Sequence, residues 1–269
     1  MPAYKNRPSM SGDTPVRRYL SLSAVIATIN TGHLRFTRVD QFQDPFEGSV
    51  PQKQLDDQIV ILIGAGSRRT MMNAVAAHYQ DMATIEPPDE DPWTRMTRLR
   101  RARTRSAHAS CWSMGAESEP LWRAYCADGV GAALRTTLAR LEVSVEAHDL
   151  YVSPIRYIQY REAQAFTDEM DSLLHKRDAF SDERELRLLK FDEAHYGALA
   201  SKGASVSELP KHISRDWVLS DVIEEIIVSP YADVDYEDWV RRTVKAADPG
   251  LASRVVLSEL HERRYAPGF

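Results

Sequence analysis

The strongest candidates for catalytic residues are the acidic and basic side chains of a short segment late in the chain, residues 183–187. On an extended strand, residues two apart project from one face, so Glu183, Glu185 and Arg187 are expected to lie side by side. Leu186 and Leu188 would then face the opposite side, into a core. Two neighbouring carboxylates beside a guanidinium can differ in pKa, one raised and the other held ionised. The pattern indicates either two acids with separate roles or a solvated strand face stabilised by an ion pair.

The second candidate is a short strand with two hydroxyl groups and an indole, formed by Ser110, Trp112 and Ser113. Its hydroxyls could bind a polar ligand while the indole stacks on a flat ring. The alternative is that Cys111 and Trp112 pack in a core and that Ser113 begins a turn. We do not expect Cys111 to act as a nucleophile, because no histidine partner can be assigned by spacing and a free cysteine usually behaves as a small buried hydrophobe.

Two residue pairs add rings and a cation to the candidate binding set. Arg18 and Tyr19 lie near the start of the chain and together suit a phosphate or a nucleotide. Trp122 and Tyr125 lie three apart, so a helix would place both rings on one side. An aromatic stripe at this spacing is more typical of a core, and a surface arginine needs no ligand, so both pairs also have a purely structural interpretation.

An arginine-rich segment follows an acidic, proline-rich loop in the middle of the chain. Four arginines recur there at spacings of three to four residues: Arg95, Arg98, Arg101 and Arg105. A helix would make most of one face cationic, which could receive nucleic-acid phosphates or an acidic partner. A solvated helix neutralised by the preceding loop, residues 86–92, is the alternative interpretation.

Composition limits the classes of protein that the chain can be. A hydrophobic fraction of 43% and a charged fraction of 27% predict a folded domain, and the net charge of −5 disfavours a surface that is basic overall. The absence of an uninterrupted apolar run of about 18 residues predicts no membrane span, and the N-terminus lacks the apolar core of a signal peptide, so we expect a cytoplasmic protein. Two cysteines and eight scattered histidines predict neither a disulfide framework nor a metal site.

Short strands interleaved irregularly with helices predict an α+β fold rather than a regular parallel α/β fold. Residues 1–15 are expected to form a flexible tail and residues 16–269 a single domain with a helical insertion around 55–105. Strands are predicted at Arg18–Leu20, Leu34–Thr37, Ala109–Ser113, Gly129–Arg135, Val152–Tyr160, Glu183–Phe191, Glu224–Val228 and Val255–Leu257. Helices are predicted at Ala24–Asn30 (capped by Ser21 or Ser23 and by Gly32), about Leu55–Met82, Thr94–Arg105, Leu121–Tyr125, Arg161–Asp178 and Tyr236–Ala247.

Several short phrases, taken in order, resemble a bacterial family that is known as a domain of unknown function and is often found in phage-defence and abortive-infection neighbourhoods. The phrases are Arg18-Tyr19, residues 32–37, the stretch 40–47 with its Asp-Pro-Phe-Glu, Ser110–Ser113, residues 121–125 with the following Gly129-Val130-Gly131, and Glu183–Arg187. They extend over nearly the whole chain, from about Val16 to Leu257. Gln43 stands where the family has Asn, Trp112 where it has Phe, and the arginine-rich segment is not part of its pattern.

The order of an early basic residue, a middle Ser-rich strand and a late Glu-x-Glu strand also resembles that of ADP-ribosyltransferases. The resemblance implies a split, mostly antiparallel β-sheet core flanked by helices, with NAD bound as a substrate. It implies that Arg18 contacts a phosphate or ribose of NAD and that Ser110 and Ser113 organise the pocket. Glu185 would stabilise an oxocarbenium-like transition state as nicotinamide leaves, and Glu183 would position or deprotonate the acceptor. The remaining residues assigned to NAD binding are Tyr19, Trp112, Trp122, Tyr125 and Arg187.

The leading hypothesis is therefore an NAD-dependent ADP-ribosyltransferase-like enzyme, acting as a bacterial defence effector or toxin. Its acceptor could be a protein or a nucleic acid, and an antitoxin or chaperone is a possible partner. One alternative is a non-enzymatic module that recognises nucleic acid or a phage component through Arg95–Arg105. Another is a nuclease that holds a divalent ion with Glu183, Glu185 and Asp44.

Overall fold

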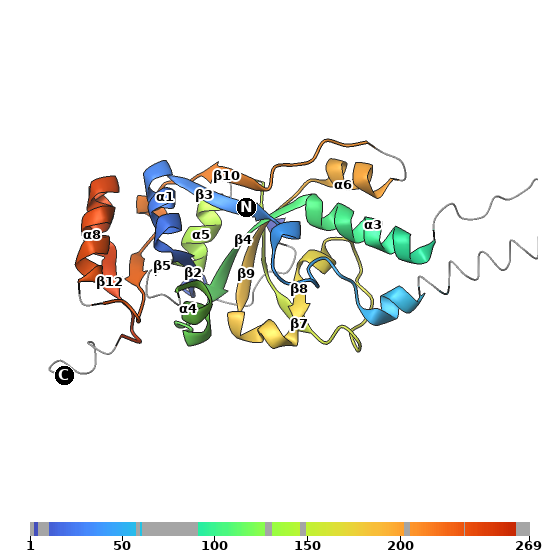
Figure 1. Cartoon of the computed structure of the whole chain (residues 1–269), viewed down its shortest axis with the longest axis horizontal. Coiled ribbons are helices and arrows are strands. Elements are labelled where there is room, and N and C mark those ends of the chain that lie inside the picture. The colour runs from blue at the N-terminus through green and yellow to red at the C-terminus, as the bar shows by residue number, and fades with distance from the viewer. Residues whose placement is uncertain are drawn as a thin grey trace, which may run out of the picture.

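A computed structural model describes residues 3–4, 11–57, 60, 91–126, 131–145, 149–201, 205–233 and 235–261. Within these residues the chain is α+β, with helices set around one large sheet whose pairings are mostly antiparallel (Figure 1). The predicted fold class is confirmed at this level. In the same residues no helix combines the length and apolar composition that crossing a membrane requires.

The large sheet has ten strands, and two of its pairings are parallel. Its strands are β1 (Ala3–Tyr4), β2 (Pro15–Ser21), β3 (His33–Arg38), β4 (Ala107–Met114), β5 (Gly131–Thr137), β6 (Tyr151–Pro154), β9 (Glu185–Phe191), β10 (His212–Asp216), β11 (Glu225–Val228) and β12 (Val255–Leu257). Their order is β1-β6-β9-β4-β2-β5-β11-β12, with β3 joined to β4 and β10 joined to β3. A second, two-stranded sheet pairs β7 (Arg156–Ile158) with β8 (His175–Arg177) in parallel.

Along one edge, strand β4 pairs with two different strands, β3 near its start and β2 near its end. The sheet therefore divides between β2 and β3 at this edge. Near its end β4 pairs with β2, and Arg17 opposite Ser113 is the inner of the two residue pairs. Near its start β4 pairs instead with β3, where Thr37 lies opposite Ala109. Over Arg18–Ser21, β2 pairs with β5 alone. Side chains that project at this division therefore come from two strands that have stopped hydrogen-bonding to each other.

The helices are α1 (Leu22–Thr31), α3 (Pro92–Arg105), α4 (Glu119–Cys126), α5 (Leu138–Val145), α6 (Glu193–Ala200), α7 (Leu219–Val222) and α8 (Tyr236–Ala247). Short 3₁₀ turns are η1 (Val39–Gln41), η3 (Asp171–Leu173), η4 (Asp178–Glu183) and η5 (Pro249–Arg254), and residues 52–57 are also helical. Helix α1 begins at Ser21, whose hydroxyl accepts from the backbone N–H of Ala24 at 3.4 Å, and ends at Gly32 with φ 63°. Both predicted capping residues are confirmed, since a hydroxyl satisfies a free N–H and glycine adopts the left-handed conformation at little cost.

The predicted helix over Arg161–Asp178 is wrong. The segment consists of turns, η3 and β8, because Asp168 and Asp171 accept hydrogen bonds from nearby backbone N–H groups at 2.8–3.2 Å and compete with helical bonding. Most of the predicted helix around 55–82, and with it most of the insertion, lies outside the described residues. Within the predicted tail, Ala3–Tyr4 pair with β6, and Pro15 already belongs to β2.

The main core joins one face of the sheet to α1, α5 and α8. Trp112 and Trp217 meet edge to face in it, with ring centroids 5.7 Å apart. Leu186 and Leu188 of β9 belong to this core, as predicted, whereas Leu189 belongs to a second core on the other face. The alternation along β9 therefore sends its odd-numbered residues, Glu185 and Arg187 included, to that second face.

Gly131 at the start of β5 lets the backbone of this strand lie close to Cys126 of α4. A larger residue at this position therefore tests the packing. A Cβ there would meet Sγ of Cys126, its Cβ at 2.8 Å and the carbonyl oxygen of Leu20 at 2.9 Å. We expect Gly131→Ala to lower the free energy of unfolding by roughly 1–3 kcal/mol in urea denaturation.

The matched control is Gly197→Ala, at an exposed position of α6 where a Cβ meets nothing within 4 Å. Because alanine is the better helix former, this substitution is expected to raise the free energy of unfolding by roughly 0.5–1 kcal/mol. Equal effects of the two substitutions would contradict the packing described.

Candidate functional site

The side chain of Arg187 lies at the centre of a buried ion-pair network. It is 0% exposed, and its Nε donates to Glu185 Oε1 at 2.7 Å. Its two terminal nitrogens donate to the two carboxylate oxygens of Glu47, each at 3.1 Å, and one of them also donates to the carbonyl of Leu173 at 2.6 Å. Burial by itself would lower the pKa of Arg187, but Glu185 and Glu47 raise it well above its ordinary value. The guanidinium is thus charged, and its two carboxylate partners share one cation.

Glu47 reaches Arg187 from the turn that contains the Asp-Pro-Phe-Glu phrase. Asp44 shapes the turn, since its carboxylate accepts from the N–H of Phe46 at 3.0 Å and its carbonyl accepts from the N–H of Glu47 at 3.1 Å. The same carboxylate binds Arg177 at 2.8 Å, and the guanidinium of Arg177 lies over the Phe46 ring, 4.5 Å from its centroid. Two of the phrases noted in the sequence, the stretch 40–47 and Glu183–Arg187, therefore contact each other through Glu47 and Arg187. The sequence analysis did not assign Glu47 to the site.

Lys176 of β8 joins the two predicted acids. Its Nζ lies 2.6 Å from Glu183 Oε2 and 2.9 Å from Glu185 Oε2. The prediction that Glu183 shares a strand face with Glu185 is wrong, because Glu183 ends η4 and Arg184 turns the chain at φ 43° before β9 begins. The two carboxylates nevertheless converge, on a lysine that no spacing in the sequence marked out.

The two carboxylates differ in pKa in the directions expected of an acid–base pair. Burial would raise the pKa of Glu185, but Arg187 and Lys176 outweigh it and lower that pKa to about 2. Burial raises the pKa of Glu183, and Lys176 offsets this only in part. Glu185 is consequently a firmly ionised carboxylate, while Glu183 takes up a proton more readily.

Three further side chains surround this acid pair where β2 and β4 separate. Cys111 projects beside Glu185, and burial followed by the Glu185 charge raises the pKa of its thiol. Tyr125 on α4 is 55% exposed, and its pKa is raised to about 12, chiefly by burial of its hydroxyl and further by the Glu183 and Glu185 carboxylates. Burial lowers the pKa of half-buried Arg18 to about 10, although Cys111 and Tyr125 oppose this. Tyr125 is thus close enough to the acid pair to feel its charge, whereas the Arg18 guanidinium donates to the carbonyl of Arg35 at 3.0 Å.

The serine strand is divided between the two faces of the sheet. Ser113 lies opposite Glu185 in the β4–β9 register and shares its face. Ser110 and Trp112 face the main core, where Ser110 is 1% exposed. Neither the hydroxyl of Ser110 nor the indole N–H of Trp112 has a hydrogen-bond partner among the described residues. Of the three residues, the structure brings only Ser113 toward Glu185.

Tyr19 and Trp122 lie together in a third core cluster. Their rings meet edge to face with centroids 4.8 Å apart. The Tyr19 hydroxyl accepts from the N–H of Ser118 at 2.9 Å, and the indole of Trp122 donates to Glu117 at 2.9 Å. Packing and hydrogen bonding explain both residues, and a ligand could reach them only if this cluster opened.

No three His, Cys, Asp or Glu side chains of the described ranges are arranged to hold a metal ion. Lys176 instead places an ammonium group between Glu183 and Glu185. The third acid of the nuclease hypothesis, Asp44, is paired with Arg177. The acids named for that hypothesis are thus bound to side-chain cations.

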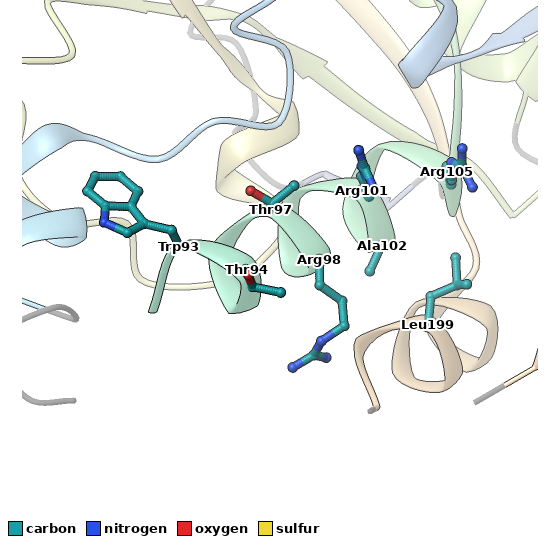
Figure 2. A pocket seen from close by; sticks show the side chains of 8 residues that line it. All are labelled: Trp93, Thr94, Thr97, Arg98, Arg101, Ala102, Arg105 and Leu199. Atoms are coloured by element: carbon teal, nitrogen blue, oxygen red, sulfur yellow. The ribbon is translucent and has the colours of Figure 1, made fainter. Parts of the chain in front are cut away.

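Helix α3 sorts its arginines into an inward and an outward set. Arg100 donates to the carbonyls of Glu47 and Pro45, and Arg103 binds Glu169 at 2.6 Å and the carbonyl of Gly48 at 3.3 Å. The outward set is the predicted one, with Arg95 and Arg101 exposed and Arg98 and Arg105 half-buried. A surface hollow of about 570 Å³ between α3 and α6 is lined by three of these four arginines, Trp93 and neighbouring residues (Figure 2).

No protein-family model, curated protein or solved structure matches the chain. The resemblances to the family of unknown function and to ADP-ribosyltransferases therefore stay predictions.

Removing one partner of the buried network should cost far more than removing a surface pair. Glu47→Gln leaves Arg187 with a single carboxylate, and we expect the free energy of unfolding to fall by roughly 3 kcal/mol or more, because a buried charge loses compensation. The control is Asp149→Asn at the exposed pair with Lys190, where the change should stay below about 1 kcal/mol. Similar losses in urea denaturation of the two variants would show that Arg187 does not depend on Glu47.

The low pKa of Glu185 predicts loss of stability in acid. A carboxylate with a folded pKa of about 2, below its ordinary 4.5, contributes stability above pH 4.5 and loses it as the pH falls toward 2. The melting temperature of the wild type should therefore fall more steeply between pH ~5 and ~2 than that of Glu185→Gln, which has no proton to take up there. Parallel melting curves across this range would indicate that Glu185 is not held ionised.

Proposed function

We propose that this protein is an ADP-ribosyltransferase-like enzyme that uses NAD as its substrate at the site formed by Glu185, Glu183, Arg18 and Tyr125. The observation that carries the proposal is the buried carboxylate of Glu185, held by Arg187 at 2.7 Å and by Lys176 at 2.9 Å beside Tyr125, near the place where β2 and β4 stop pairing. A fixed negative charge beside a cation and a ring is what cleavage of a dinucleotide at its glycosidic bond requires.

Each group has a role that matches its environment. Arg18 would bind the pyrophosphate, and the exposed ring of Tyr125 would stack on the nicotinamide or the adenine. The bond between the ribose C1′ and nicotinamide would break with its electron pair leaving on nicotinamide, and the ionised Glu185 would stabilise the positive charge left on the sugar. An acceptor hydroxyl, amine or water would then bond to C1′, and Glu183 would take its proton.

The arrangement of cations favours this chemistry over the nuclease hypothesis. Lys176 lies between the two acids at 2.6 and 2.9 Å, and a divalent ion would have to displace that ammonium group. In glycosyl transfer the same lysine has a use, because together with Arg187 it keeps Glu185 ionised. Action as a defence effector or toxin, with an antitoxin or chaperone as partner, is part of the same proposal.

The test is nicotinamide release from NAD by the purified protein, with and without cell lysate. We expect release by the wild type and a loss of roughly 100-fold or more in Glu185→Gln, because the transition state loses its nearest negative charge. Circular dichroism and the melting temperature of the variant establish that it is folded. Release that requires lysate would identify transfer to a macromolecule rather than to water.

Tyr125→Ala provides a second variant that leaves the core intact, since its side chain is more than half exposed. It should raise the KM for NAD, whereas Trp239→Ala, an exposed aromatic on α8, should leave the KM unchanged. If the folded wild type releases no nicotinamide in either condition and NAD does not raise its melting temperature, the proposal is wrong.

A further inference from the structure

We propose that the outward face of α3 is a binding site for single-stranded nucleic acid, in which arginines contact phosphates and Trp93 stacks on a base. The proposal does not rest on NAD chemistry, because none of its residues belongs to the Glu183–Glu185 site. It rests on how the helix divides its arginines, on the exposed ring at its start and on the hollow beside it (Figure 2).

Arg100 and Arg103 explain how the helix is held in place, and Arg95 and Arg101 take no part in those contacts. Arg100 and Arg103 bind the carbonyls and the carboxylate described above and fasten α3 to the turn that carries Glu47. Arg95 and Arg101 are exposed and form no ion pair with the described part of the chain. Arg105 shares its charge with Glu208 at 3.0 Å. Positive charge thus remains on a helix that has no acidic residue, in a protein whose net charge is −5.

The groups around these arginines fit a nucleic acid strand better than an acidic peptide. Trp93 is 61% exposed, and an aromatic ring beside a cationic track is how proteins bind single strands without reading their sequence. Thr97 adds an exposed hydroxyl group that can donate to a phosphate oxygen. In Figure 2 Arg101 and Arg105 project together from the helix while Trp93 projects at its other end. From Trp93 to Arg105 the helix rises about 18 Å, which is enough for several nucleotides.

The cap of the helix fixes the backbone position of Trp93. Asp91 accepts from the N–H groups of Trp93 and Thr94, each at 3.0 Å, so the first turn is held in place. The helix therefore fixes the backbone position of Trp93 relative to that of Arg101. A preformed track of this kind loses little conformational entropy on binding.

The experiment measures binding of fluorescent RNA and DNA oligonucleotides of mixed sequence, about 12 nucleotides long, by anisotropy at several salt concentrations. We expect the affinity of the wild type to fall steeply with salt, and Arg95→Glu/Arg101→Glu to bind at least ~10-fold more weakly with a smaller salt slope. Trp93→Ala should weaken binding by ~5-fold or more and leave the salt slope unchanged.

Helix α8 supplies matched controls. Arg242→Glu/Lys245→Glu makes the same change in net charge at two exposed helical positions, and Trp239→Ala removes an exposed ring. Both should bind oligonucleotides like the wild type, and so should Glu185→Gln, which separates this proposal from the NAD proposal. The absence of binding at low salt, an equal loss in the α8 charge reversal, or polyglutamate competing better than RNA would each overturn the assignment.

Discussion

The buried guanidinium of Arg187 is the interaction on which the described site depends. A charge that is fully removed from water is tolerated only when its donors are paired, and here Glu47, Glu185 and the carbonyl of Leu173 pair them. These partners come from separate parts of the chain, so the network sets where the turn at 44–48, the turn η3 and the strand β9 lie relative to one another. Breaking it would loosen all three.

The same network decides the chemistry available at the site. With Arg187 on one side and Lys176 on the other, Glu185 stays ionised although it is buried. Glu183 is less well compensated and its pKa is raised. The difference arises from geometry, because both residues are glutamates and only their neighbours differ. An ionised acid beside one that can accept a proton is the arrangement that glycosyl transfer from NAD would use.

Helix α3 connects this site to the surface. Arg100 and Arg103 bind the turn that supplies Glu47, and the opposite face carries the remaining arginines and the ring of Trp93. One helix thus combines a structural role with a candidate binding face. Its six arginines have similar local sequence surroundings, and only contact with the neighbouring turn separates the two groups.

Local pattern was sufficient for the α+β class, for α8 over Tyr236–Ala247, for the caps of α1 and for the alternation that places Leu186 in the core and Glu185 opposite it. These features depend on neighbours in the chain, through helical spacing, capping and strand periodicity. Tertiary structure alone decided that Glu47 pairs with Arg187, 140 residues away, and that Lys176 joins the two acids. Such contacts follow from the order of strands and from turns such as Arg184, and no local spacing encodes that order.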